Sequence, residues 1–137
     1  MLALAVACAA SSGRGNPVSP SPASLDEAFD LKAGGSTTIR DENLQVGFDR
    51  VLSDSRCPRG TRCIAEGDAT VRVWLLKPPR GRAAHELQTT PPAAAEAAYD
   101  GYRIRLVALA PYPEGDRPVR SSEYVTTLVV TRSQASP

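Results

Sequence analysis

Histidine is the residue that this sequence most clearly lacks, since the 137-residue chain has only one, His85. Structural zinc sites use four Cys or His ligands, so His85 and one pair of cysteines are too few for such a site. A Gly-x-Ser-x-Gly nucleophile elbow is also absent, which removes a common hydrolase signature. We therefore expect no catalytic role for His85, but a partly buried position or one on an edge strand. A hydrolase that works through two carboxylates stays open as the enzyme alternative, because distant strands can meet in space.

The sequence also lacks an excess of either charge and any long apolar run. Lys and Arg together number 16 and Asp and Glu 15, so the formal net charge is +1. This balance gives no electrostatic argument for a nucleic acid or for an anionic membrane surface. The N-terminal run MLALAVAC is much shorter than the roughly 20 apolar residues that span a bilayer. We expect no nucleic-acid partner, no cofactor, and contact with a membrane only through a lipid anchor.

What the N-terminus does contain predicts export. Its apolar residues are followed by small residues and a cysteine, as at the end of a secretory signal. The end of this run, AVAC, resembles a bacterial lipobox, in which the cysteine, here Cys8, is lipidated. We therefore assign residues 1–8 to a signal remnant with a lipobox-like cysteine. The expected location is the periplasm or the outer surface, with secretion as the alternative.

The segment after Cys8 has the composition of a tether. Residues 9–24 are rich in Ser, Gly, Pro and Asn and hold few large apolar groups, so they cannot bury enough surface to offset their ordering entropy. Residues 25–133 are then expected to form one domain, since the chain is long enough for one core and hardly for two.

Cysteine is scarce too, with three in the chain. If Cys8 carries the anchor, Cys57 and Cys63 remain as an even pair in an oxidising compartment, which predicts a disulfide. The alternative is a cytosolic protein with three free thiols. Cysteines this close in sequence need a chain reversal, which the turn formers Pro58 and Gly60 make feasible.

From residue 25 onward apolar and polar residues alternate, and no amphipathic helix of normal length is present. We predict an all-β fold, an antiparallel β-sandwich of about seven strands, immunoglobulin-like, with a small β-barrel as the alternative. A phase shift at Val51 predicts a bulge or a strand end. The Ala-rich segment 93–98 is expected to form one helical turn. The residues that alternate on one face are Phe29 and Leu31; Thr37 and Ile39; Leu44, Val46 and Phe48; Ala69, Val71, Val73 and Leu75; His85 and Leu87; Tyr102, Ile104, Leu106 and Ala108; and Tyr124, Thr126, Leu128 and Val130.

The run FDRVLSDSRCPRGTRCIAEGDATVRV carries the most specific motif of the chain. It resembles a family of small bacterial lipoproteins and secreted proteins of uncharacterised function. The family commonly has Trp soon after the second cysteine, where this chain has Ala65 and Glu66. The resemblance covers most of residues 29–131 and implies an exported domain, but no activity. The matching residues are Phe48, Val51, Asp54, Ser55, Arg56, Cys57, Pro58, Cys63, Ile64, Gly67, Ala69 and Val71, and then Leu106, Leu109, Pro111, Tyr112 and Pro113 in a later Leu-x-x-Leu-x-Pro-Tyr-Pro.

The first interpretation of this motif is a rigid loop. Pro58 and Gly60 favour turns, and Asp54 and Ser55 can accept hydrogen bonds from nearby backbone N–H groups. Arg56 can pair with Asp54 or with Asp49. A disulfide across so short a loop should contribute about 2 kcal/mol. A structural role needs nothing more than these features.

Three functional hypotheses for the loop stay open beside the structural one. Arg59 and Arg62 can form a recognition surface on a preorganised ring. The same arginines can present the 57–63 loop to a trypsin-like protease, as in an inhibitor. A third hypothesis is a calcium site, because carboxylate oxygens suit calcium. Its candidate ligands are Asp49, Asp54, Glu66 and Asp68.

Two aromatic residues complete the candidate binding residues. Trp74 alternates with the apolar residues of its strand, so it faces outward, either as a binding surface or covered by proline-rich loops. Tyr112 lies between two prolines and is either a loop anchor or an exposed contact. We predict a non-catalytic binding or structural module of the cell envelope, a monomer with an envelope protein as partner. Either a carboxylate-based enzyme or a protease-inhibitor-like protein is the alternative.

Overall fold

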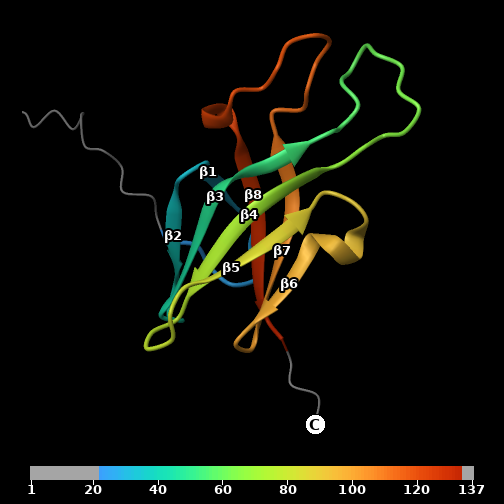
Figure 1. Cartoon of the computed structure of the whole chain (residues 1–137). Helices are drawn as coiled ribbons and strands as arrows, with labels where there is room; N and C mark the ends of the chain where they lie inside the picture. Colours follow the sequence, from blue (N-terminus) through green and yellow to red (C-terminus); the bar gives the residue numbers. More distant parts are fainter. Residues whose placement is uncertain (1–21, 134–137) are drawn as a thin grey trace, which may run out of the picture.

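The computed structural model describes residues 22–133, which form two antiparallel sheets of four strands each (Figure 1). The strand orders are β2–β3–β4–β5 in one sheet and β1–β8–β7–β6 in the other. Within residues 22–133 no strand pairing joins the two sheets, so the fold is an open β-sandwich, as predicted, and not the alternative barrel. The strands are β1 Phe29–Lys32, β2 Ser36–Ile39, β3 Leu44–Asp54, β4 Ala69–Leu76, β5 Ala83–Gln88, β6 Glu96–Tyr99, β7 Tyr102–Ala110 and β8 Val125–Arg132.

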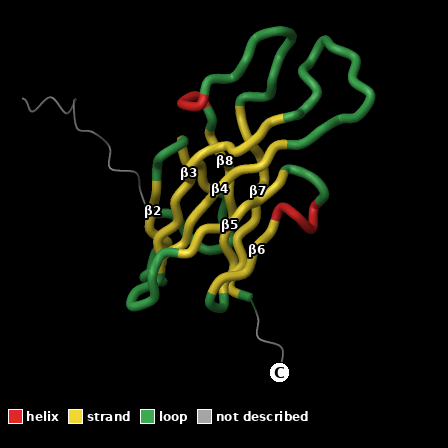
Figure 2. Tube along the Cα trace, in the orientation of Figure 1, coloured by secondary structure: helices red, strands yellow, loops and turns green. Residues whose placement is uncertain are grey.

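The Ala-rich segment differs from its prediction. A 3₁₀ turn, η1, covers only Pro92–Ala95, and the chain continues as β6, which pairs with β7 (Figure 2). Alanine has little preference for strands, so this eighth strand had only a weak signal in the sequence. A second 3₁₀ turn, η2, covers Ser121–Glu123 just before β8. No helix among the described residues has the length and apolar character needed to cross a membrane.

The core lies between the inner faces of the two sheets, and strand alternation explains it. In β4, Ala69, Val71, Val73 and Leu75 have no exposed surface, while the residues between them are partly exposed. Phe48 of β3 is fully buried in the same cluster. Period-two alternation thus places one side of each strand in the core, as the sequence indicated.

Strand β3 contains the predicted irregularity and continues beyond it. Its register with β4 shifts between Phe48 and Arg50 and again between Val51 and Ser53. Such bulges bend a strand and increase its twist. The strand therefore leaves the sandwich obliquely and leads directly into the motif loop at Ser55.

Not all domain boundaries lie in the described part of the chain. Cys8 and most of the predicted tether fall outside residues 22–133. Ala23, which the sequence placed in the tether, is instead buried, and its N–H donates to the Thr38 carbonyl at 3.0 Å. The ordered domain thus begins at least two residues before Leu25.

Candidate functional site

Two long loops leave the same end of the sandwich and lie side by side (Figure 1). The first, residues 55–68, joins β3 to β4 and carries the cysteine motif. The second, residues 111–124, joins β7 to β8 and begins with the Pro-Tyr-Pro segment. We call these segments the paired loops, because an isolated bridge links Arg59 to Glu114.

The predicted disulfide is present in the first loop. Cys57 and Cys63 are bonded, with 5.9 Å between their Cα atoms. The Thr61 N–H donates to the Pro58 carbonyl at 3.2 Å, and Gly60 has a φ of 85°. Proline, then glycine with positive φ, makes the tight turn that closes the ring.

Arg56 ties this loop to the second one. Its side chain is buried and makes an ion pair with Asp54 at 2.8 Å, so Asp54, and not Asp49, is its partner. The guanidinium also donates to the carbonyls of Leu109 at 2.8 Å and Pro111 at 3.0 Å. Charge-assisted bonds of this kind are about twice as strong as neutral ones. The Asp-Ser-Arg motif and the Pro-Tyr-Pro motif therefore meet at one side chain.

Backbone bonds extend this connection outward. The Arg59 N–H donates to the Pro113 carbonyl at 3.0 Å, and the Gly115 N–H donates to the Arg59 carbonyl at 2.9 Å. The Tyr112 hydroxyl donates to the Cys57 carbonyl at 2.8 Å. Tyr112 is thus the loop anchor that the sequence allowed, yet the residue is still 39% exposed.

The base of the first loop is closed by Ser55 and Gly67. The Ser55 hydroxyl donates to the Asp68 carbonyl at 2.9 Å, and a side chain at Gly67 would begin 1.8 Å from the Ser55 carbonyl oxygen. Gly67 also has a φ of 71°. Only glycine fits this close approach and this backbone angle without strain.

Burial and hydrogen bonding shift the pKa values at this junction. Burial alone would raise the pKa of Asp54, but hydrogen bonds from Arg56 and Tyr124 outweigh it and hold that pKa below its ordinary value. Burial, and then the hydrogen bond that its hydroxyl donates to Asp54, raise the pKa of Tyr124 to about 12. Both shifts have structural causes, so they do not by themselves mark a catalytic group.

The raised pKa of Tyr124 predicts a loss of stability in alkali. The folded state keeps the phenol proton longer than the unfolded state, so the contribution is complete below pH 10 and is lost as pH rises towards about 12. The free energy of unfolding should fall across this window in urea titrations, and less steeply in Tyr124→Phe. Part of the decline should remain in that variant, because the pKa of Tyr102 is raised by burial too. Identical pH profiles for the two proteins would contradict the assignment.

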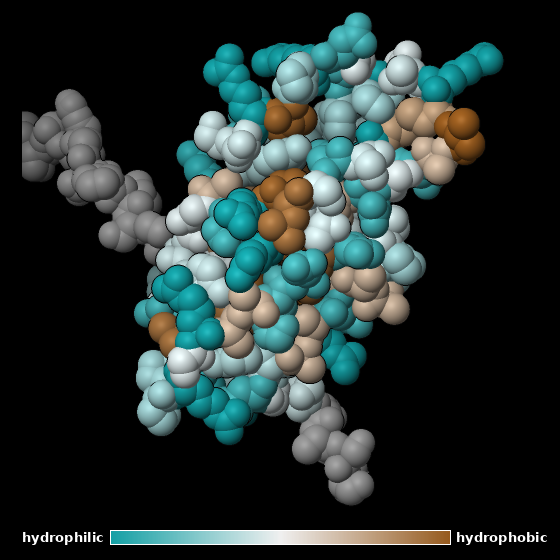
Figure 3. All heavy atoms as spheres, in the orientation of Figure 1, coloured by the Kyte–Doolittle hydropathy of each residue, from teal (hydrophilic) through white to brown (hydrophobic). Residues whose placement is uncertain are grey.

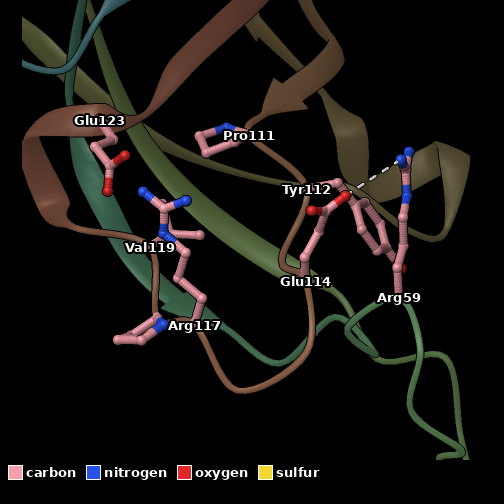
Figure 4. Close-up of a pocket in the computed structure, with 8 residues that line it drawn as sticks. Arg59, Pro111, Tyr112, Glu114, Arg117, Val119 and Glu123 are labelled. Carbon is pink, nitrogen blue, oxygen red and sulfur yellow. Dashed lines mark ion pairs between the residues drawn. The ribbon is translucent and has the colours of Figure 1, made fainter.

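A cavity of about 300 Å³ opens between the paired loops (Figure 4). Glu114 makes an ion pair with Arg59 at 3.7 Å, and the Arg117 guanidinium points towards Glu123 (Figure 4). The Glu123 carboxylate accepts a hydrogen bond from the Arg120 N–H at 2.9 Å. The lining residues are Arg59, Pro111, Tyr112, Glu114, Arg117, Pro118, Val119 and Glu123.

These two carboxylates are the geometrical candidates for the hydrolase alternative. Glu114 is 67% exposed and paired, and Glu123 caps η2, so each already has a structural partner. His85, the remaining candidate, packs edge-on against Tyr99, with 6.2 Å between the ring centroids. The arrangement offers a mixed-charge binding surface more readily than an acid and a base.

The four predicted calcium ligands do not come together. The Asp54 carboxylate makes an ion pair with Arg56, and the Asp49 carboxylate lies 3.7 Å from the Arg72 guanidinium. Glu66 and Asp68 use their backbone carbonyls within the loop. In the part of the chain that the structure describes, no group of three or more His, Cys, Asp or Glu residues could hold a metal ion. The four candidate residues therefore do not form the proposed calcium site.

Trp74 lies away from the paired loops. It faces outward from β4, as predicted, and is half-buried, with the Arg82 guanidinium 3.9 Å from its ring centroid. Beneath it, a side chain at Gly47 would begin 2.0 Å from the ring. Trp74 is thus packed between a glycine and an arginine, and it does not join the other candidate residues.

This packing makes Gly47→Ala a testable change. The new methyl group should push the only Trp of the chain outward, shift its fluorescence to longer wavelength and lower the free energy of unfolding by about 1–3 kcal/mol. Gly81→Ala is the matched control, because nothing lies within 4 Å of its new methyl group. An unchanged emission spectrum in Gly47→Ala would contradict the contact.

Several residues of the paired loops were not predicted from the sequence to be part of a site. Arg117, Val119 and Glu123 lie between the last two alternating segments and carry no motif, so nothing in the sequence marked them as candidates. Ile64 was noted only as a motif match, yet it is fully exposed at 108%. Figure 3 shows apolar side chains on the loop that joins β3 to β4.

Comparison with known proteins adds no relative. No family model matches the chain, no curated protein matches it, and no solved structure matches its fold.

Proposed function

We propose that this chain is a non-catalytic binding module of the cell envelope whose binding surface is the end formed by the paired loops. The observation that carries the proposal is the junction at Arg56, which unites two loops from different sheets. A disulfide and two cross-loop backbone bonds hold the rest of the surface. A surface fixed in this way loses little conformational entropy when it binds.

The chemistry of this surface favours a protein partner. Arginine and tyrosine, which are enriched at protein interfaces, line the cavity together with proline, valine and two glutamates. The net charge of +1 gives no basis for binding nucleic acid. We propose a monomeric module that binds an envelope protein.

Export and lipidation belong to the same proposal. Disulfides form and persist in oxidising compartments, so the bond between Cys57 and Cys63 supports export. Mass spectrometry of the protein from its own membrane should show a lipidated Cys8 at the N-terminus. An intact Met1 on a cytosolic protein would contradict export.

The binding proposal is tested by comparing two double variants in co-purification from envelope extracts. Arg62→Ala with Arg117→Ala removes two exposed arginines of the paired loops. Arg80→Ala with Arg103→Ala removes two exposed arginines elsewhere, each in a single ion pair. A partner retained by wild type and by the control, but lost by the loop variant, is the expected result. Equal retention by both variants would place the binding surface elsewhere.

A further inference from the structure

Residues 62–65, at the end of the disulfide ring and just beyond it, differ from their neighbours in their backbone hydrogen bonding. The neighbouring residues are paired: the Thr61 N–H donates to Pro58, and the Glu66 carbonyl accepts from Cys57 at 2.8 Å. Between them, residues 62–65 make no hydrogen bond to any other residue that the structure describes. This short segment therefore offers free N–H and C=O groups to a partner, as an edge strand does.

The side chains of this segment are also free. Ile64 is fully exposed, and Arg62 is exposed and has no ion pair among residues 22–133. Arg59, the other arginine of the ring, differs, because it pairs with Glu114. The exposed side chains of Arg62 and Ile64 are therefore available to fill pockets on a partner protein.

The segment is held at both ends. Cys63 is bonded to Cys57, whose carbonyl is held by Tyr112. Glu66 is held by the Cys57 N–H and is followed by the tight contact between Gly67 and Ser55. Free backbone in a segment that is fixed on both sides is preorganised for pairing with another chain.

We propose that residues 62–65 bind in the active-site cleft of a serine protease that cleaves after arginine, and that they inhibit it. The inference rests on the proposed binding function and names the class of its partner. Such a cleft forms strand-like hydrogen bonds with the backbone of the segment that it binds. Its specificity pocket holds a carboxylate that receives an arginine side chain, here Arg62.

The disulfide explains why the loop would inhibit and not simply be cut. The protease serine oxygen would bond to the Arg62 carbonyl carbon, the bond to the Cys63 nitrogen would break, and the protease histidine would pass the serine proton to that nitrogen. The freed Cys63 amine stays tied to Cys57 through the disulfide. It can attack the acyl-enzyme again, which re-forms the peptide bond and returns the proton to the serine.

Arg62 is favoured over Arg59 by backbone geometry. A reacting carbonyl must enter the oxyanion hole of the protease, so its oxygen must be free. The Arg59 carbonyl already accepts from the Gly115 N–H at 2.9 Å, and its N–H donates to Pro113. In the described part of the chain, the N–H and the carbonyl of Arg62 make no such backbone hydrogen bond.

Bovine-type trypsin is the probe, with the full chain as inhibitor. We expect competitive inhibition with a dissociation constant of about 1 μM or tighter, within the range of interfaces of standard size. Arg62→Ala should weaken inhibition by about 30-fold or more, the loss typical of a central anchor residue. Arg80→Ala, which removes an exposed arginine outside the paired loops, is the matched control and should stay within about threefold. Arg62→Leu should transfer inhibition from trypsin to chymotrypsin, and thermal unfolding should confirm that each variant is folded.

Three results would overturn the proposal: no inhibition of trypsin by the folded protein, rapid and complete hydrolysis of the loop, or equal losses in Arg80→Ala and Arg62→Ala. If trypsin is not inhibited but the envelope partner still depends on the paired loops, this inference fails and the proposed function stands. If Arg62-dependent inhibition occurs but no envelope protein co-purifies, the protease assignment stands and the envelope partner is rejected.

Discussion

Replacing Arg56 with methionine is expected to lower the free energy of unfolding by about 3–5 kcal/mol, the usual loss when one partner of a buried ion pair is removed. The two side chains are only 7% and 11% exposed, so solvent screens the pair little. Methionine fills much of the space but donates no hydrogen bond. The Asp54 carboxylate then loses its main partner, and the carbonyls of Leu109 and Pro111 lose their donor.

Urea titration measures this loss, and Arg72→Met is its matched control. Arg72 pairs with Asp49 at 3.7 Å, but both side chains are more than two-fifths exposed. Exposed pairs contribute about 0–1 kcal/mol, so the control should change stability little. If Arg56→Met costs no more than Arg72→Met, Arg56 does not join the loops as described.

Gly67→Ala is expected to cost about 2–4 kcal/mol for two reasons that act together. A left-handed backbone costs a residue with a Cβ roughly 1–2 kcal/mol, and Gly67 has a φ of 71°. The new methyl group would also begin 1.8 Å from the Ser55 carbonyl oxygen, so the backbone must move. Because three hydrogen bonds join Ser55 to Asp68, this movement opens the base of the loop.

Gly60→Ala separates the two causes. Gly60 has a φ of 85°, but nothing lies within 4 Å of its new methyl group. It should show only the conformational cost of roughly 1–2 kcal/mol. Chemical denaturation of both variants gives the comparison, and equal losses would mean that the contact with Ser55 has no energetic consequence.

The fold was predictable where strands alternate over several residues. β4 has a clean period-two pattern and buries its predicted face. In β7 the pattern holds only to Leu106: the register with β8 shifts between Leu106 and Ala108, so Ala108 is exposed, contrary to the prediction, and Leu109 is buried in its place. β6 was missed because two of its residues are alanine, whose small side chain signals neither strand nor core. The immunoglobulin-like topology stays a prediction, since two open sheets fit more than one sandwich family.

The candidate site was predictable in part. The disulfide followed from the even cysteine pair, and the pairing of Arg56 with Asp54 was one of two local choices. The contact between the loops was not predictable, because Tyr112 and Cys57 are 55 residues apart. The two motifs were recognised separately, and only the three-dimensional structure explains why a chain with Asp-Ser-Arg-Cys-Pro also has Pro-Tyr-Pro.

Amide hydrogen exchange tests the central claim, that the paired loops form one rigid unit. The N–H groups of Arg59 and Gly115 each cross from one loop to the other, at 3.0 and 2.9 Å. In the wild-type protein both amides should exchange slowly, while the amides of Ile64 and Ala65, which make no such bond, should exchange at nearly the rate of free peptide. Arg56→Met should speed the exchange of Arg59 and Gly115 but leave the amide of Val73 in the core strand protected. Rapid exchange of Arg59 and Gly115 in the wild-type protein would contradict the account.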